Sequence, residues 1–272
     1  MEGVGVHTGA KASVTLRPAE PDSGIVITNQ NFPDNPIQLG CCIPEQAMHA
    51  TVIMSQGWGV STIEHLLAAV SGLKIDNILI DIDGPEVPIL DGSALPFVQI
   101  IGDMGVVEQD KSKKYLTPKK TIKFEDNNSR FIEITPKYDG AKDLTFDYTI
   151  EFEHPLVQGS QLSGVLSEDF FIQEIAPART FGFLEQLPFL RKHGLAQGTT
   201  LGNTVVVGDN IFLNSLRFSD EFIRHKILDL VGDLALLGKN LTGNVRAHKT
   251  GHNFNRKVIE HYINNPKDWE TL

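Results

Sequence analysis

The sequence predicts an α+β protein built from two similar domains, each a sheet with helices. Three observations lead to this fold class. Strand-like segments precede helical segments in the first part of the chain, and the same order returns in the second part. Between them, residues 108–120 are charged, contain a proline and lack a periodic apolar face, which is typical of a linker. A chain of 272 residues is long enough for two modest domains. We therefore expect domains at residues 1–112 and 113–272.

The first domain is expected to contain strands followed by two helices. Alternating apolar residues predict strands at residues 12–18, 24–28 and 77–84. Residues 61–73 have the pattern of a buried helix that ends at Gly72. Residues 85–105 indicate a strand, a tight turn at Asp91 and Gly92, and a helix capped by Ser93.

The second domain is expected to repeat this order with one added element. Its predicted strands are residues 121–126, 130–136, 144–154 and 243–249. Helices are predicted near residues 167–175, at 220–237 and from about Asn255 onward. The added element, residues 183–207, has the pattern of a helix, a glycine-rich loop and a strand. No repeat is visible at the level of sequence, so the similarity of the domains is architectural.

Composition excludes several classes of protein. The formal net charge of −10 argues against a general nucleic-acid binder, which needs a basic face. The two cysteines, Cys41 and Cys42, are adjacent and do not form the framework of a disulfide-rich secreted protein, so the expected compartment is the cytosol. No apolar run approaches the ~18 residues of a membrane span, and no signal peptide is visible. Any membrane association is therefore expected to be peripheral.

The most informative segment is the predicted helix at residues 220–237. Three polar residues follow one another at i, i+4 and i+8: His225, Asp229 and Asp233. Residues four apart lie on one face of a helix, and the rest of this helix has a buried pattern. Burying this much polarity is costly unless a metal or a tight hydrogen-bond network compensates it. The helix is bounded by Ser219 or Asp220 at its start and by Gly238 just after its end.

His65 completes a candidate metal site with His225 and Asp229. Two histidines and one carboxylate form a common catalytic zinc set, in which water takes the fourth position. Such a site stays positively charged and lowers the pKa of its water toward ~7. Glu64 would then lie beside the metal and accept the proton of that water. The alternatives are a capping box between Ser61 and Glu64, a core histidine at 65, and a chance H-x-x-x-D pair.

Two further segments have residues suited to catalysis. His252 follows a glycine between a predicted strand and a predicted helix, where a histidine is well placed as a general acid. The alternative is a loop histidine with a local hydrogen bond. Thr180 could donate a hydrogen bond to a developing oxyanion, and Phe181 and Phe183 beside it could form an apolar wall. The alternative there is a short strand end that packs its aromatic side chains.

Six short segments, in this order, resemble one enzyme family. They are residues 3–9 (GVGVHTG), 62–69 (TIEHLLAA), 85–94 (PEVPILDGSA), 178–183 (ARTFGF), 224–234 (RHKILDLVGDL) and 251–255 (GHNFN). The family is that of the UDP-3-O-acyl-N-acetylglucosamine deacetylases (LpxC) of lipid A synthesis in Gram-negative bacteria, and the resemblance covers nearly the whole chain. It implies that the helices of both domains pack between two outer sheets, with the active site at the domain junction.

The resemblance also implies a zinc-dependent hydrolysis that releases acetate and a free amine. The implied ligands are His65, His225 and Asp229, a set that also suits Fe²⁺. Glu64 is implied as the general base, and His252, oriented by Asp233, as the acid that protonates the leaving amine. Thr180 would help the zinc to stabilise the oxyanion. Lys226 would add positive charge at the site, or would act only as a structural ion-pair partner.

Substrate recognition follows from the same resemblance. Residues 183–207 correspond to an insert that forms a hydrophobic passage for the acyl chain, and the leucines suited to this role are Leu184, Leu187, Leu190 and Leu195. Phe181 would stack on the sugar, Lys249 would meet the diphosphate, and Met48 would line the metal cavity beside an unusual His49. The alternatives are plain packing of an amphipathic helix for the leucines and a solvated strand end for Lys249.

The family further implies a monomeric cytoplasmic enzyme, peripheral to the inner membrane and subject to a regulatory protease system. This sequence departs from the family pattern in two places. Members carry another strand before residues 3–9, whereas this sequence begins just before them, so an exposed sheet edge is expected. The loop at residues 197–202 also has fewer consecutive glycines.

Two rival functions remain open from the sequence. One is a zinc hydrolase with a different amide substrate, although a peptidase usually carries H-E-x-x-H on one helix and this chain does not. The other is a non-catalytic binder of UDP-sugars or acyl chains. Such a binder is expected to have lost a metal ligand, the base or the acid, and all of these positions are occupied here by the residue types that the chemistry needs.

Overall fold

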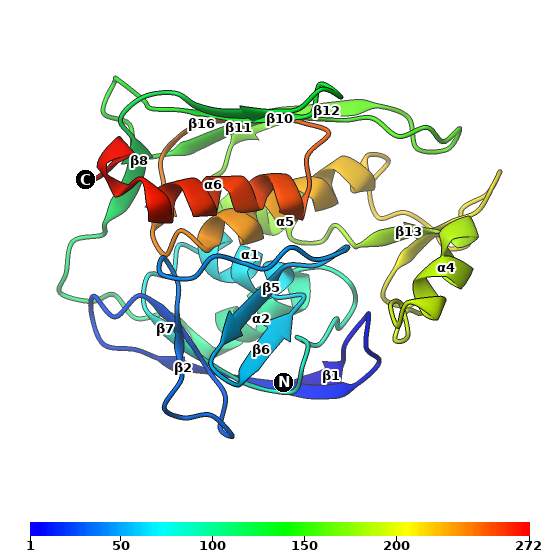
Figure 1. The fold of residues 1–272 in the computed structure, drawn as a ribbon, viewed down its shortest axis with the longest axis horizontal. Helices are drawn as coiled ribbons and strands as arrows, with labels where there is room; N and C mark the ends of the chain where they lie inside the picture. The colour runs from blue at the N-terminus through cyan, green and yellow to red at the C-terminus, as the bar shows by residue number, and fades with distance from the viewer.

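Two five-stranded sheets form the outer layers of the molecule, and helices fill the space between them (Figure 1). The computed structural model describes residues 1–272. The first sheet has the strand order β1 (Glu2–Val4), β2 (Lys11–Pro18), β7 (Ile78–Asp83), β3 (Ile25–Thr28) and β4 (Ile37–Gln38). The second has the order β12 (Ser160–Val165), β11 (Leu144–Ile150), β16 (Gly243–His248), β10 (Phe131–Thr135) and β9 (Ile122–Glu125). The predicted α+β class, with helices between two sheets, is confirmed.

The two sheets share one topology. When the strands of each sheet are numbered along the chain, both sheets have the order 1-2-5-3-4. In both, the third and fifth strands pair in parallel, β3 with β7 and β11 with β16, and every other pairing is antiparallel. One helix precedes the fifth strand and one follows it. These helices are α1 (Glu64–Gly72) and α2 (Leu95–Met104) in the first half, and α5 (Glu221–Ala235) and α6 (His252–Asn264) in the second.

α1 and α5 form the centre of the molecule. Eight of the nine residues of α1 and thirteen of the fifteen of α5 are buried. α1 is largely apolar and must be covered on all sides. α5 also buries polar residues, and hydrogen bonds compensate for their burial. The two helices cross at Gly232, where an added Cβ would lie only 2.0 Å from the carbonyl oxygen of Glu64. Glycine therefore permits the close approach that brings the start of α1 against the middle of α5.

Several shorter elements surround this frame. Before α1 lies a hairpin of β5 (Val52–Ser55) and β6 (Trp58–Ser61), which the sequence patterns did not reveal. A small sheet at the C-terminal end contains β15 (Asn240–Leu241), β8 (Tyr115–Pro118) and β17 (Trp269–Thr271), the last preceded by a 3₁₀ turn at Pro266–Asp268. Before the insert, α3 (Glu168–Phe170) continues into a π-helical turn at Phe171–Ile175.

The predicted insert forms a compact unit at one end of the molecule. It comprises β13 (Phe181–Phe183), a 3₁₀ turn (Leu184–Gln186), α4 (Leu187–Lys192) and β14 (Val205–Val207). β13 and β14 pair in parallel. Figure 1 shows α4 projecting at the right, beside the region where α5 begins.

Three element predictions were wrong in detail. Residues 85–91 form only an isolated bridge between Ser61 and Glu86, not a strand. β8 begins inside the segment predicted as a linker. The last helix begins at His252 rather than near Asn255. The side chains of His252 and Asn255 both hydrogen-bond to Asp233, and these bonds hold the first turn of the helix. No helix of the protein has the length and apolar character required to cross a membrane.

Candidate metal and catalytic site

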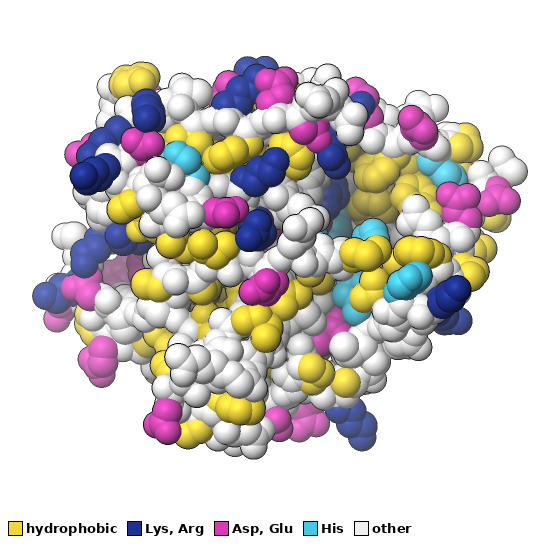
Figure 2. All heavy atoms as spheres, in the orientation of Figure 1, with side chains coloured by type: hydrophobic (Ala, Val, Ile, Leu, Met, Phe, Trp, Pro, Cys, Tyr) yellow, Lys and Arg dark blue, Asp and Glu magenta, His cyan; other side chains and the backbone are white.

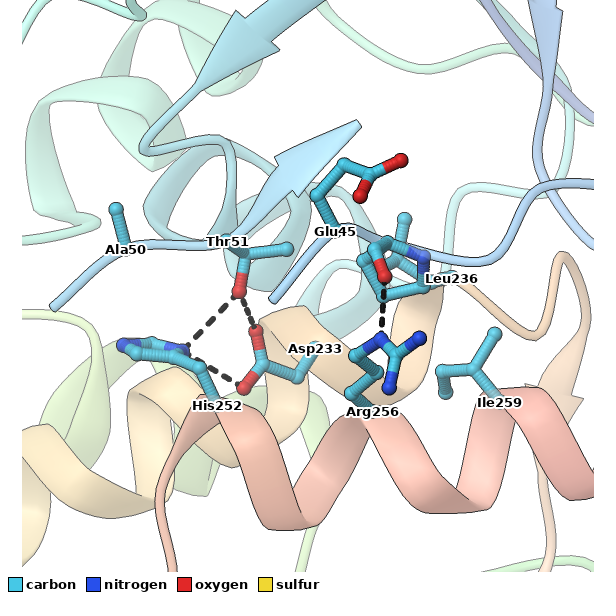
Figure 3. A pocket seen from close by; sticks show the side chains of 9 residues that line it. Glu45, Ala50, Thr51, Asp233, Leu236, His252, Arg256 and Ile259 are labelled. Atoms are coloured by element: carbon cyan, nitrogen blue, oxygen red, sulfur yellow. Dashed lines mark hydrogen bonds and ion pairs between the residues drawn. The ribbon is translucent and has the colours of Figure 1, made fainter. Parts of the chain in front are cut away.

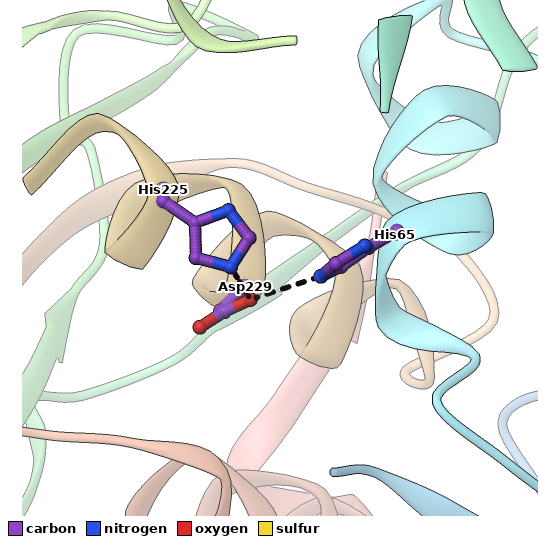
Figure 4. Close-up of side chains that lie close together, drawn as sticks. All are labelled: His65, His225 and Asp229. Carbon is purple, nitrogen blue, oxygen red and sulfur yellow. Dashed lines mark ion pairs between the residues drawn. The ribbon is translucent and has the colours of Figure 1, made fainter. Parts of the chain in front are cut away.

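Three donor side chains converge where α1 meets α5. His65 comes from the first turn of α1, and His225 and Asp229 come from successive turns of α5 (Figure 4). One potential ligand atom from each lies within 4.8 Å of the other two. Asp229 Oδ1 lies 3.7 Å from His65 Nε2 and 3.3 Å from His225 Nε2, and the two imidazole rings stand nearly perpendicular at 88°. All three residues are buried.

Neighbouring groups orient these side chains toward a common point. His225 Nδ1 donates to the carbonyl oxygen of Ala178 at 3.1 Å, which leaves the lone pair of Nε2 free to face Asp229. Lys226 Nζ donates to Asp229 Oδ2 at 2.6 Å, so Oδ1 faces both imidazoles. Lys226 thus forms an ion pair with Asp229, and its positive charge lies beside the cluster. Orientation of ligands by such outer contacts is usual in metal sites.

The ionisation states of the three residues fit a divalent cation. Burial lowers the pKa of His65 to about 3 and also lowers the pKa of His225, so both imidazoles are neutral at neutral pH. Burial alone would raise the pKa of Asp229, but the adjacent Lys226 ammonium holds it well below its usual range. Two neutral imidazoles and one carboxylate are the ligands that catalytic zinc sites use, with one position left open.

Glu64 lies beside this cluster with its carboxyl group turned away from its own helix. Its Oε2 accepts a hydrogen bond from the backbone N–H of Thr51 at 3.1 Å. The cap position of α1 is Ile63, which makes no side-chain cap, so the alternative of a capping box with Ser61 is wrong. Burial raises the pKa of Glu64 to about 8. A bound cation would lower this pKa again, because an adjacent positive charge favours the carboxylate.

His252 faces Glu64 from the first turn of α6. Its Nε2 lies 3.8 Å from Glu64 Oε1. Figure 3 shows its Nδ1 bonded to Asp233 Oδ2, at 2.9 Å. The alternative of a loop histidine with a local contact is wrong, because its partner comes from α5. Burial would lower the pKa of His252, but the carboxylates of Asp233 and Glu64 raise it to about 9. At neutral pH this imidazole carries a proton and can donate it.

Two residues of the site were missed by sequence reasoning. Thr51 donates its hydroxyl to Asp233 Oδ1 and also lies 3.1 Å from His252 Nδ1. Asn255 donates its side-chain amide to Asp233 Oδ2 at 2.8 Å. Neither residue has a sequence signal that distinguishes it from an ordinary loop or helix residue. Together with His252 they satisfy both oxygens of a carboxylate that is only 2 % exposed.

The remaining predicted residues surround the cluster at different depths. Phe181 packs edge-on against Phe222 and lies 6.2 Å from the His225 ring, so β13 borders the candidate metal site. Phe183 belongs to the same aromatic group through Phe181. Thr180 precedes these residues, and its backbone bonds to Gly92 and Val205.

Two predicted substrate contacts lie toward solvent. Lys249 pairs with the exposed Glu151 three residues before the start of α6. Met48 has half of its surface exposed, at 51 %, on the segment that leads to Thr51. The structure therefore places both side chains outside the buried cluster.

The insert presents apolar side chains that the core does not use. No residue of α4 is buried, which argues against plain core packing of its leucines. Three large apolar side chains of the insert are exposed, Leu184, Phe189 and Leu201, and two more, Ile211 and Leu213, follow it directly. Figure 2 shows hydrophobic side chains gathered in a hollow at the right, between the upper sheet and α4, with histidines beside it.

The fold buries three potential metal ligands with a carboxyl group and an imidazole beside them, an arrangement typical of metal-dependent hydrolases. A family model described as "LpxC: UDP-3-O-acyl N-acetylglycosamine deacetylase" matches residues 1–264. The chain belongs to this family, whose members are metalloenzymes.

Individual relatives agree with the family model over nearly the full length of the chain. A UDP-3-O-acyl-N-acetylglucosamine deacetylase from Histophilus somni is 41% identical over 98% of this chain and 88% of its own length. Proteins of the same description from Syntrophotalea carbinolica and Myxococcus xanthus are 43% and 41% identical over 100% of this chain and over 87% and 86% of their own lengths.

Proposed function

We propose that this protein hydrolyses the N-acetyl group of UDP-3-O-acyl-N-acetylglucosamine and releases acetate, the committed step of lipid A biosynthesis. The observation that carries the proposal is the buried convergence of His65, His225 and Asp229 with Glu64 and His252. These groups come from three helices that belong to the two sheet units. Family membership supplies the substrate, since the relatives carry this activity in their descriptions.

The metal proposed for the site is zinc. Two neutral imidazoles and one carboxylate suit it, and Fe²⁺ fits the same donors. His65, His225 and Asp229 would hold the ion, with Lys226 and the carbonyl of Ala178 fixing the orientation of the ligands. A bound zinc ion supplies Lewis acidity toward an amide carbonyl and acidifies water at neutral pH.

The side chains then divide the proton transfers of amide hydrolysis. Glu64 takes a proton from the attacking water while the oxygen of that water forms a bond to the acetamide carbon. His252 gives its proton to the glucosamine nitrogen as the carbon–nitrogen bond breaks. Asp233 keeps the imidazole of His252 oriented and protonated. The acid and the base thus lie on the two sides of a gap of 3.8 Å between His252 Nε2 and Glu64 Oε1.

Residues at the border of the site are proposed to bind the rest of the substrate. Thr180 would donate to the developing oxyanion, and the ammonium of Lys226 would add positive charge there. Phe181 would stack on the sugar, and Lys249 would meet the diphosphate. Phe183 and Met48 would form apolar walls. The acyl chain would occupy the insert of residues 183–207, whose exposed apolar side chains support this placement.

Further properties are proposed from the family alone. The protein would act as a monomer in the cytoplasm, peripheral to the inner membrane. A regulatory protease system would control its amount. The domain boundary near residue 112, in the loop before β8, is proposed from composition.

Acetate release from UDP-3-O-acyl-N-acetylglucosamine by the purified protein tests the proposal. We expect turnover that stops with a chelator and returns with added zinc. Asp229→Ala should abolish both stoichiometric metal and turnover, whereas Asp81→Asn, a buried carboxylate of β7 far from the cluster, should change neither. A folded, zinc-loaded protein without acetate release would point to another amide or to a binding protein. Stoichiometric zinc in Asp229→Ala would contradict the ligand set.

A further inference from the structure

Glu86 is a fully buried carboxylate that the proposed chemistry does not use. Its side chain is 0 % exposed. Oε1 accepts hydrogen bonds from the backbone N–H of His7 at 2.9 Å and from the hydroxyl of Thr62 at 2.8 Å. Oε2 accepts from the backbone N–H and the hydroxyl of Thr8, at 2.8 and 2.6 Å. Only neutral donors surround it, and no lysine or arginine pairs with it. A buried carboxylate is costly, so this arrangement calls for a reason.

One partner of Glu86, Thr62, lies in the segment that leads directly into α1. Thr62 has a φ of +56°, which is a strained conformation for a β-branched residue. It lies two residues before Glu64. Backbone hydrogen bonds from Ser61 to Pro85 and from Val87 to Ser61 hold the two segments together on either side. The bond from the Thr62 hydroxyl to Glu86 therefore fixes a strained residue at the start of the helix that carries Glu64 and His65.

A second route reaches Glu64 from the other side. The ring nitrogen Nε2 of His7 lies 3.2 Å from the carbonyl oxygen of His49, to which it can donate. Two residues later, the backbone N–H of Thr51 binds Glu64 and its hydroxyl binds Asp233. Glu86 thus binds the turn at residues 5–8 and the segment before Glu64. Through His7, this turn also supports the segment at residues 49–51, which binds the Glu64 carboxylate.

The turn at residues 5–8 also binds the loop of the insert. The backbone N–H groups of Gln197 and Gly198 donate to the carbonyl oxygens of His7 and Val6 at 2.9 and 3.0 Å. A Cβ on Gly198 would lie 2.1 Å from the carbonyl oxygen of Gly5. A Cβ on Gly5 would lie 2.0 Å from Glu86 Oε2. Glycine at both positions allows the insert loop, the turn and Glu86 to stack directly on one another.

We propose that Glu86 is a positioning residue that ties the insert loop to the start of α1 and sets the placement of Glu64 and His65 against α5. The inference rests on the proposed function where kcat is measured. Where the absorption spectrum of the Co²⁺-loaded protein is measured, it rests only on the candidate metal cluster. It gives a single role to residues 3–9 and 85–94, two segments whose conspicuous sequences have no part in the chemistry.

Glu86→Gln tests this role while keeping the size of the side chain. A glutamine amide has one acceptor oxygen, so its NH₂ group must face the backbone N–H of either His7 or Thr8. We expect this repulsion to shift the turn and to disturb the hydrogen bond to Thr62. We expect kcat to fall by about 10–100-fold, as for other groups that orient metal ligands, with little change in KM. The visible absorption spectrum of the Co²⁺-loaded protein should also shift, because His65 moves. Asp81→Asn is the matched control, because its buried carboxylate also accepts side-chain hydrogen bonds, from Thr28 and Gln30. It should change thermal stability only.

A suppressor distinguishes positioning from general stability. Glycine adopts a φ of +56° without strain, so Thr62→Gly should no longer need the carboxylate. Glu86→Gln should therefore cost less kcat in a Thr62→Gly background than in the natural chain, because only the contacts through His7 and Thr51 remain to be disturbed. Thr62→Val keeps the strain and removes the hydrogen bond, and it should lower kcat and shift the Co²⁺ spectrum as Glu86→Gln does.

The outcomes separate this inference from the proposed function. Equal losses from Glu86→Gln in both backgrounds, or a lowered Tm with unchanged kcat and Co²⁺ spectrum, would overturn it. If the natural protein releases no acetate, the Co²⁺ spectra of the same variants still decide the positioning role. If Glu86→Gln does not fold, the Co²⁺ spectra of Thr62→Val and Thr62→Gly decide the positioning role. Similar spectra would overturn the inference, whereas a shift confined to Thr62→Val would support it.

Discussion

Asp233 shows how a single buried residue can set the charge of its neighbours. It accepts hydrogen bonds from His252, Asn255 and Thr51, which fill both of its oxygens. The carboxylate of Asp233 raises the pKa of His252 against the effect of burial. The acid of the proposed reaction is therefore prepared by residues that need not touch the substrate.

His252→Ala is the prediction at this scale. Removal of a positioned general acid typically lowers the rate by 10²–10⁴-fold, so kcat should fall by about this factor while KM changes little. Steady-state acetate release, with metal content measured in parallel, checks it. A change confined to KM would mean that His252 binds substrate instead of donating a proton.

At the scale of elements, the crossing of α1 and α5 decides whether the site exists. Sequence spacing alone identifies the face of α5 that carries His225, Asp229 and Asp233, because a helix has one periodicity. It does not reveal that the start of α1 meets this face, since that contact depends on the missing side chain of Gly232.

Gly232→Ala should therefore separate the two helices. A Cβ placed 2.0 Å from a backbone oxygen cannot be accommodated by a rotamer change. Overpacking of this kind costs about 1–3 kcal/mol, and metal binding should weaken because His65 moves away from α5. Gly102→Ala in α2 is the control: it meets nothing within 4 Å and should stabilise the protein by about 0.5–1 kcal/mol. Thermal unfolding and metal stoichiometry measure both effects; unchanged values for Gly232→Ala would refute the argument.

Local patterns predicted most elements but few of the contacts between them. The buried strands and helices follow from apolar periodicity, and spacing puts His225 and Asp229 on one helix face. Spacing does not join His65 to them, and it became a candidate ligand only through its residue type and the family resemblance. The start of α6 was misplaced because tertiary hydrogen bonds to Asp233, not a local cap, fix it. Thr51 and Glu86 could not be predicted at all, because their partners are distant in sequence and a lone threonine or glutamate has no distinctive pattern.

At the scale of the whole molecule, two units of identical topology make one site. The helix before the fifth strand is α1 in one unit and α5 in the other, and these two helices supply all three candidate metal ligands. The helix after the fifth strand is α2 or α6, and only α6 contributes, through His252. The architecture is therefore symmetric where it builds the frame and asymmetric where it places the acid.

Acid stability is a property of this whole frame, and Glu221 at the start of α5 should contribute strongly to it. Burial would raise its pKa, but hydrogen bonds from Arg179 and Arg217 hold the pKa below its usual value. A folded-state pKa below the unfolded one gives stability that is present above the unfolded value of 4.5 and is lost as the pH falls through the folded value.

Glu221→Gln should thus lower the free energy of unfolding at pH 7, by about 3–5 kcal/mol for one partner of a buried pair. It should also flatten the decline below pH 4.5 that the natural chain shows. Urea unfolding at several pH values measures this, with the exposed Glu153→Gln as control. Parallel pH profiles for the natural chain and Glu221→Gln would count against the assignment.

The candidate metal donors on α1 and α5 also link the stability of the fold to the concentration of free metal. An ion held jointly by the two units binds the native state and has no such site in the unfolded chain. By mass action, each tenfold rise of free metal above its dissociation constant adds about 1.4 kcal/mol to the free energy of unfolding. With an ion in the proposed site, metal shortage would therefore remove this part of the stability of the fold together with the proposed activity.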